Sequence, residues 1–256
     1  MTAWPKGGSS RDSRIHLLIT CEHGGIRAPP AYRSLLDRCG PDLRSHCAYD
    51  LGAASLARFL SRRFHAPLHV SSLSRWVVDL NRSRGHPRLF SEAVRALPRE
   101  EREAILRRYY DPYRLRVQAG IIDALDRKDV VLHLSVHSFT PVLDSRTRTA
   151  DVGLLYDPCR HLEKRFCGAW RKFLGQALPG WVIRRNYPYL GRADGFVTHL
   201  RRLHAPARYL GVELEFNQKW VGGGGAVERE LSEALARTLQ EAMQALDQTC
   251  GHRTSL

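Results

Sequence analysis

Short apolar runs alternate with longer amphipathic segments along most of this 256-residue chain. Six runs have the length and composition of buried strands: 15–20, 76–79, 130–136, 152–156, 181–183 and 209–216. Four segments carry apolar residues at helical spacing: 50–64, 98–126, 161–174 and 228–246. Strands that alternate with helices favour an α/β fold, with a mostly parallel or mixed sheet covered by helices on both faces.

The domain organisation is predicted to be simple. We find no internal repeat and no low-complexity linker, so we expect a single catalytic domain over 15–249. A flexible N-terminal arm is expected at 1–14 and a tail at 250–256. No apolar stretch is long enough to cross a membrane, and the first residues lack the apolar core of a secretory signal. Six cysteines without a C-x-x-C pair indicate reduced thiols, so we expect a cytoplasmic protein.

The chain carries a net charge of +14. Its arginines are spread along the whole sequence and never form the run of like charges that marks a nucleic-acid-binding tail. We therefore expect neither a nucleic acid nor a membrane as partner. A diffuse positive field is better suited to attracting small anionic substrates. Nothing in the sequence indicates the number of subunits.

Polar side chains stand at the ends of three predicted strands. Glu22 and His23 follow the first run, His137 follows the run 130–136, and Glu213 and Glu215 lie in the last. In an open α/β sheet, ligands bind beyond the carboxyl ends of the strands. Two imidazoles and a carboxylate brought together there suit a catalytic zinc site with one open position. A further carboxylate would serve as the general base.

The run 76–79 leads into Asn81 and Arg82. The planar guanidinium of an arginine can bind a carboxylate through two parallel hydrogen bonds, and a neighbouring amide adds a directional contact. These residue types therefore indicate a subsite for an anionic substrate.

Six short motifs occur in a recognisable order: TCEHGG, YDLGA, VDLNRS, HSFTPV, NYPYLGRADGF and ELEFNQ. From about Ile15 to Leu246, the chain resembles the N-formylglutamate amidohydrolase family, which belongs to the wider clan of zinc carboxypeptidases and aspartoacylases. The resemblance implies a phosphorylase/hydrolase-like α/β fold. It also implies that one divalent metal ion, zinc, supports cleavage of an amide bond to an amino acid.

The resemblance also assigns roles to residues. His23 and His137 match the metal-site histidines, and Glu215 matches the general base. Asn81 and Arg82 match a pair that binds either the substrate carboxylate or the scissile carbonyl. Where relatives carry a second polar ligand, this chain has Ile26, which cannot bind a metal.

Two acids can replace the missing ligand. Glu22, next to His23, is the leading candidate for the third ligand. Asp50 is the alternative, either as a ligand or as a partner that holds an imidazole.

Further residues are expected near the site or in the core. Asn186, Tyr189 and Asp194 are predicted to lie in a loop that lines the substrate pocket. Glu213 is expected to lie deeper than Glu215, on the same strand face, beside a buried partner. His133 is expected to be structural.

The leading hypothesis is a zinc-dependent amidohydrolase that acts on a small anionic N-acyl amino acid of the N-formyl-L-glutamate type. Two alternatives remain open. One is a metal-dependent amidase or carboxypeptidase-like enzyme acting on a peptide or cell-wall fragment. The other is a metal-free binding module on the same scaffold, which the departure at Ile26 would favour.

Overall fold

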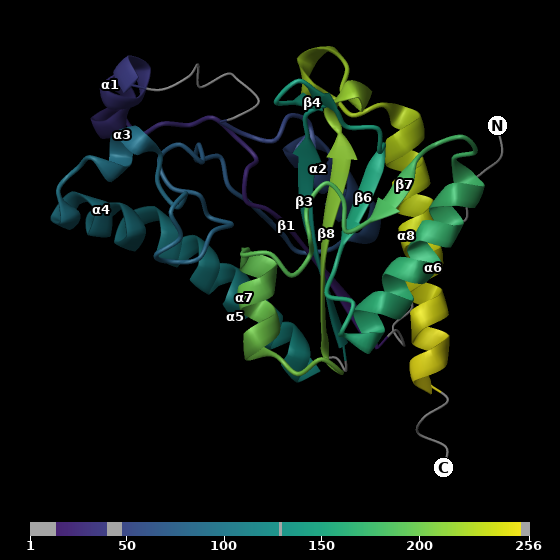
Figure 1. Ribbon diagram of the computed structural model, residues 1–256. Helices are drawn as coiled ribbons and strands as arrows, with labels where there is room; N and C mark the ends of the chain where they lie inside the picture. The colour runs from purple at the N-terminus through teal and green to yellow at the C-terminus, as the bar shows by residue number, and fades with distance from the viewer. Residues whose placement is uncertain (1–13, 40–47, 128–129, 252–256) are drawn as a thin grey trace.

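A six-stranded sheet forms the centre of the computed structural model, which describes residues 14–39, 48–127 and 130–251. Its strands are β1 (Ile15–Cys21), β2 (Leu68–Val70), β3 (Val130–Phe139), β6 (Val152–Leu155), β7 (Ile183–Arg185) and β8 (Tyr209–Asn217). They lie in the order β2-β1-β3-β8-β6-β7, and Figure 1 labels the strands of this order from β1 to β7. Neighbouring strands are parallel except β6 and β8, which are antiparallel. The predicted fold class, a mixed α/β sheet with helices on both faces, is confirmed.

Two layers of helices enclose the sheet (Figure 1). One layer contains α2 (Ala53–Phe64), α6 (His161–Ala177) and α8 (Arg229–Gly251). The other contains α1 (Pro30–Cys39), α3 (Glu92–Arg95), α4 (Arg99–Ile105), a π-helical turn (Leu106–Tyr110), α5 (Asp111–Arg127) and α7 (Phe196–Leu203). Smaller elements are the hairpin of β4 (Val142–Leu143) and β5 (Arg146–Thr147) and the 3-10 turns Gln218–Trp220 and Gly223–Gly225. No helix among the described residues has the length and apolar character to cross a membrane.

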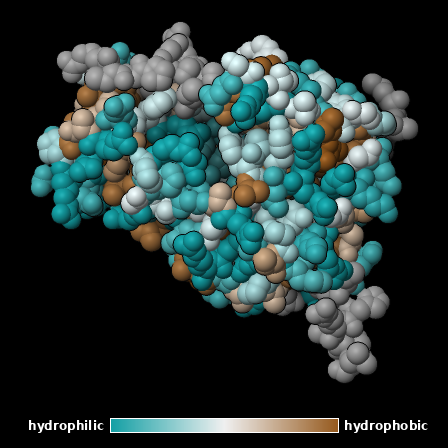
Figure 2. Space-filling model, in the orientation of Figure 1, coloured by the Kyte–Doolittle hydropathy of each residue, from teal (hydrophilic) through white to brown (hydrophobic). Residues whose placement is uncertain are grey.

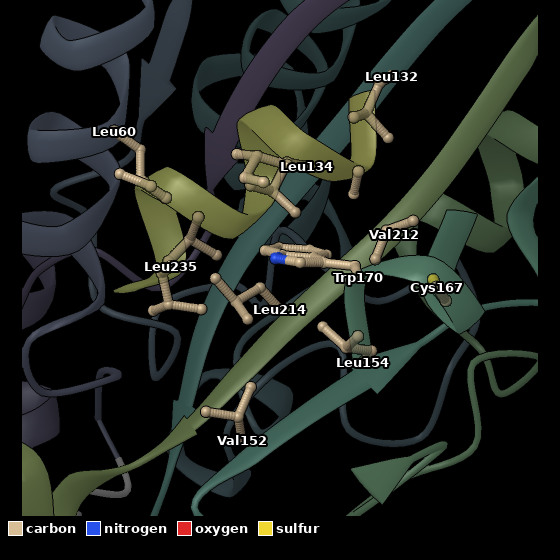
Figure 3. Close-up of a cluster of buried hydrophobic side chains, with 14 of the residues drawn as sticks. Leu60, Leu132, Leu134, Val152, Leu154, Cys167, Trp170, Val212, Leu214 and Leu235 are labelled. Atoms are coloured by element: carbon tan, nitrogen blue, oxygen red, sulfur yellow. The ribbon is translucent and has the colours of Figure 1, made fainter. Parts of the chain in front are cut away.

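The core on the first face is built around Trp170 of α6, which is fully buried (Figure 3). Leucine and valine side chains of β3, β6 and β8 surround its ring, together with Leu60 of α2 and Leu235 of α8. The indole nitrogen donates a hydrogen bond to Thr238 Oγ1 at 3.0 Å. The only polar atom of this large side chain is therefore satisfied, and the ring contributes its full apolar surface to the core.

The alternation of side chains along each strand separates this core from the second face. On β3, Leu132, Leu134 and Val136 pack into the first core. The intervening residues His133, Ser135 and His137 lie on the opposite face, where α5 and α7 pack. Three alternate residues of β3 are thus polar and buried, which is unusual unless those groups bind one another or a ligand.

Gly24 and Gly25 allow the chain after β1 to pass close to the segment after β2. A Cβ atom on Gly24 would lie 2.6 Å from a Val70 side-chain carbon, and one on Gly25 would lie 2.6 Å from the Ser72 carbonyl oxygen. Only glycine fits at both positions. The Gly-Gly pair therefore follows His23 for a packing reason, and it fixes the path of the chain as it leaves the sheet.

The segment 76–79 is not a strand, although its sequence predicts one. The backbone runs through turns there, with the Val77 N–H bonded to the Ser74 carbonyl and the Asp79 N–H to the Leu89 carbonyl. Val77 and Val78 are nevertheless almost fully buried. The apolar run correctly indicated burial, but burial alone does not determine backbone conformation.

Other boundaries moved by a few residues. The predicted strand 181–183 is β7 at Ile183–Arg185, and the predicted long helix 98–126 consists of α4, the π-helical turn and α5. Of the predicted arm and tail, 1–13 and 252–256 lie outside the described residues, and α8 extends through Gly251.

Candidate active site

Three buried side chains converge beyond the carboxyl ends of β1 and β3. His23 follows β1, His137 lies near the end of β3, and Asp50 precedes α2. Asp50 Oδ2 lies 2.8 Å from His137 Nδ1 and 3.4 Å from His23 Nδ1. One possible ligand atom from each of the three residues lies within 4.8 Å of the others.

The other ring nitrogen of His23 is held by a carboxylate. His23 Nε2 lies 2.7 Å from Asp79 Oδ1. Asp79 Oδ2 in turn accepts a hydrogen bond from Arg75 at 2.7 Å, and the Asn81 N–H donates to Asp79 Oδ1 at 3.0 Å. Because an ionised carboxylate only accepts, His23 donates through Nε2 and its Nδ1 atom faces Asp50.

The other ring nitrogen of His137 is held in a similar way. His137 Nε2 lies 2.9 Å from Ser135 Oγ and 3.3 Å from Glu22 Oε2. Ser135 donates to Glu22 Oε2 at 2.7 Å, and the Tyr113 hydroxyl donates to Glu22 Oε1 at 3.1 Å. Glu22 therefore lies at the ring edge opposite Asp50, with both of its oxygens already bonded.

The carboxylates around these rings are held in their charged form. Burial alone would raise the pKa of Glu22, but its hydrogen bond with His137 and the nearby positive charge lower that pKa well below the ordinary range. Burial likewise acts against charge on Asp50, and the attraction of His23 and the hydrogen bond with His137 lower its pKa strongly. Two charged carboxylates beside two imidazoles make this corner a strong site for positive charge.

The donor set fits a metal ion. With Nε2 of each ring donating, neutral imidazoles present the lone pairs of their Nδ1 atoms to the carboxylate of Asp50. Such an arrangement is repulsive unless a cation, either a proton or a metal ion, lies between these atoms. Two imidazole nitrogens and one carboxylate oxygen are a common ligand set of catalytic zinc.

Glu215 lies beside this cluster. It is paired with His137 in the register of β3 and β8 and is only 5% exposed, and its Oε2 atom has no hydrogen-bond partner among the described residues. Burial raises the pKa of Glu215 to about 8, and the nearby Asp50 and Glu213 add to the shift against opposing cations. A carboxyl group with a pKa near neutrality can accept and release a proton in this environment.

Glu213 does not lie deeper than Glu215, and that expectation is wrong. Glu213 is partly exposed, whereas Glu215 is buried, and both line the same pocket. The strand direction alone suggested the reverse order, but the exposure of these two side chains does not follow their position along β8.

A pocket of about 550 Å³ opens over these groups. In Figure 2, the surface is hollowed between the part that carries α1 and α3 and the top of the sheet, and hydrophilic residues gather around the hollow. Asn81 and Arg82 line the pocket. Arg82 donates one hydrogen bond to the backbone oxygen of Asp194 at 2.8 Å, and Asn81 Oδ1 accepts from the Phe196 N–H at 2.7 Å.

The predicted loop residues fall into two groups. Tyr189 and Asp194 line the pocket. The side chain of Asn186 instead bonds the loop internally, because its Oδ1 atom accepts from the N–H groups of Tyr156 and Gly191. Ile26, at the position of the missing ligand, is 39% exposed.

Sequence reasoning missed the partner of His23. Asp79 was interpreted as the end of a strand, although it belongs to the same short motif, VDLNRS, as Asn81 and Arg82. Its role as a hydrogen-bond acceptor for His23 depends on a contact across 56 positions of sequence, which no local pattern indicates. His133 is structural as expected, since it is fully buried between Thr20 and the Tyr209 hydroxyl.

Comparisons with known proteins identify the family and the fold of this chain. A sequence model of the N-formylglutamate amidohydrolase family matches residues 15–221. The crystal structure of gene product Atu2144 from Agrobacterium tumefaciens has a TM-score of 0.76 at 29% identity, covering 91% of this chain and 92% of that one. N-formylglutamate amidohydrolase from Ralstonia eutropha JMP134 has a TM-score of 0.66 at 18% identity, covering 90% and 94%. No curated protein matches the sequence.

Proposed function

Because this chain belongs to the N-formylglutamate amidohydrolase family, we propose that it hydrolyses the amide bond of a small anionic N-acyl amino acid, of the N-formyl-L-glutamate type, with one bound divalent metal ion, zinc. The observation that carries the proposal is the convergence of His23, Asp50 and His137 at the floor of the pocket.

The free, buried Cys21 and Cys167 are compatible with a reducing compartment, and we propose the cytoplasm as the location of the protein.

The proposed metal ligands are His23 Nδ1, His137 Nδ1 and a carboxylate oxygen of Asp50. Asp50 is preferred to Glu22 because both Nδ1 atoms face Asp50, whereas Glu22 bonds Ser135 and Tyr113 at the far edge of the His137 ring. Glu22 and Asp79 then orient the two imidazoles. A zinc ion bound there supplies Lewis acidity, which polarises an amide carbonyl and makes a nearby water molecule more acidic.

Glu215 is the proposed general base. Its Oε2 atom, which the described part of the chain leaves without a hydrogen-bond partner, lies buried at the pocket floor and is available to a water molecule. A carboxylate there would take the proton of the attacking water and deliver it to the leaving nitrogen, which must be protonated before it can depart as an amine.

Arg82 is the proposed partner of the substrate carboxylate, with Asn81 beside it. Arg82 uses one terminal nitrogen to bind the Asp194 backbone, which fixes the direction of its guanidinium group. A positioned arginine in the pocket would hold an anionic substrate in one orientation over the floor.

Chelation of the purified protein tests the metal requirement. We expect formate release from N-formyl-L-glutamate to stop when the metal is removed and to return on adding Zn²⁺.

A variant of one proposed ligand tests the same requirement. His137→Ala should lose both metal and turnover while the folded structure remains, as judged by circular dichroism. His161→Ala, at an exposed position on α6, is the matched control and should behave as wild type. Full turnover by metal-free protein would disprove the proposal.

A further inference from the structure

Large apolar side chains gather at the rim of the pocket. Leu143, Tyr189 and Leu190 are 40%, 48% and 67% exposed, and all three line the pocket. Single exposed apolar residues are normal on a protein surface. Several at the mouth of one pocket, above a polar floor, instead mark a place where an apolar ligand group binds. We call these three residues the apolar rim.

The apolar rim is held in place by its neighbours. The guanidinium of Arg148 lies 5.4 Å from the ring centre of Tyr189 and 5.8 Å from that of Phe139. Arg148 also donates a hydrogen bond to the Tyr189 hydroxyl at 3.3 Å. Arg201 anchors the loop after Leu190, because it donates a hydrogen bond to the Gly191 backbone oxygen at 2.6 Å. A rim fixed in this way can bind an apolar group without a large ordering cost.

Three arginines of the pocket come from one segment of the chain. Arg82, Arg88 and Arg95 line it from the segment that leads into and through α3. Leu143 belongs to β4, which stands well apart from α3 at the carboxyl end of the sheet (Figure 1). Arg148 also lines the pocket and lies against Tyr189, so positive charge reaches the apolar rim as well. The carboxylate of a substrate bound over the floor fits the arginines near α3, and an apolar group of the substrate fits Leu143 and Leu190.

The volume of the pocket is also larger than an N-formyl amino acid, the smallest of the proposed substrates, requires. Its volume of about 550 Å³ lies within the range of roughly 300–1,000 Å³ that encloses drug-sized ligands. A formyl group is a single carbon. If the carbonyl of a formyl group lay over the pocket floor, the apolar rim would stay exposed to water.

We propose that the apolar rim is an acyl-group subsite, so that the preferred substrates are N-acyl amino acids whose acyl group is a hydrocarbon chain or an aromatic ring. This inference rests on the proposed amide hydrolysis at the floor of the same pocket. It adds a substrate class that a formyl-specific site would exclude.

A series of N-acylated L-glutamates tests the inference: N-formyl, N-acetyl, N-hexanoyl and N-benzoyl. In a hydrophobic pocket, even one methylene changes kcat/KM by about tenfold or more. We therefore expect kcat/KM of the wild type to be at least about tenfold higher for the hexanoyl and benzoyl compounds than for the formyl compound. N-formyl-L-phenylalanine is included to separate an effect of the acyl group from one of the amino-acid side chain.

Variants connect the preference to the apolar rim. In the double variant Leu143→Ser with Leu190→Ser, the ratio of hexanoyl to formyl kcat/KM should fall by about tenfold or more. Leu203→Ser is the matched control, because Leu203 is 48% exposed at the end of α7 and does not line the pocket. Its ratio should equal that of wild type. Thermal unfolding of each variant checks that the fold is retained.

The outcomes separate this inference from the function on which it rests. Hydrolysis of the formyl compound with equal or lower rates for longer acyl groups would overturn the acyl subsite and leave the proposed function standing. An unchanged ratio in the double variant, or a preference that follows only the phenylalanine side chain, would also overturn it. No hydrolysis of any compound by the zinc-loaded protein would overturn both.

Discussion

At the scale of single residues, the site depends on which edge of an imidazole each carboxylate faces. Glu22 and Asp50 both contact His137, but Asp50 faces Nδ1 and Glu22 faces Nε2. The sequence identified both acids and favoured Glu22, but it could not show which edge of the His137 ring each acid faces, because that depends on how the ring is turned. That orientation follows from Ser135, two positions away on β3, and from Tyr113 on α5.

Replacement of Glu215 tests its role as the base. We expect Glu215→Gln to retain zinc and to lower kcat by about 10²–10⁴-fold, because an amide cannot take up the proton of water. Glu213→Gln is the control from the same strand face and should lose much less. Steady-state kinetics with elemental analysis checks both. If Glu213→Gln bound zinc but were inactive while Glu215→Gln remained active, Glu213 would be the base instead of Glu215.

The buried His133 should make stability depend on pH. Burial lowers the pKa of His133 to about 4 from its ordinary value of 6.5. The unfolded chain therefore binds a proton that the folded protein does not. The stability that the neutral ring contributes is complete above the unfolded pKa and is lost as the pH falls towards 4.

Urea unfolding at pH 7.5 and pH 5 measures this effect. Between these values, we expect His133 to account for roughly 2 kcal/mol of lost unfolding free energy. In His133→Gln, which cannot titrate, the loss should be smaller by that amount. Equal losses in wild type and variant would show that His133 is not the group responsible.

At the scale of elements, the central strands of the sheet were easier to predict than its edge strand and the buried loops. The runs that became β1, β3 and β8 were found from composition alone, because buried central strands are rich in leucine, isoleucine and valine. β2 was missed, since its three residues are only partly buried at the edge of the sheet. The run 76–79 was misread because Val77 and Val78 are buried without joining the sheet.

Gly153 tests how β6 holds the pocket loop. It pairs with Glu215 across the sheet, and a Cβ atom on it would lie only 1.8 Å from the Tyr187 carbonyl oxygen. Gly153→Ala must displace the loop that carries Tyr189, at an expected cost of about 1–3 kcal/mol in unfolding free energy.

Gly175 of α6 provides the control, because a Cβ atom there would meet nothing within 4 Å. Gly175→Ala should be neutral or stabilising by up to about 1 kcal/mol, since alanine favours the helix. Urea unfolding compares the two variants. If Gly153→Ala were as stable as wild type, the close approach of β6 and the loop would not restrict this position.

At the scale of the whole molecule, the sequence predicted the architecture better than the site. The alternation of apolar runs and amphipathic segments was sufficient for a mixed α/β sheet, because it depends on local periodicity. The pocket depends on contacts between distant segments, such as Arg82 with Asp194 and His23 with Asp79. The net charge of +14 is likewise a property of the whole chain, and several arginines line the pocket beside its carboxylates.

Zinc titration of chelator-treated protein, followed calorimetrically, tests the central claim that His23, Asp50 and His137 hold the metal. We expect one equivalent of Zn²⁺ to bind wild type and Asp50→Asn to lose binding, because the variant lacks the anionic oxygen that faces both Nδ1 atoms. Glu22→Gln should still bind one equivalent, about 10–100-fold more weakly, since it only orients His137. Full binding by Asp50→Asn together with none by Glu22→Gln would contradict this account and make Glu22 the ligand.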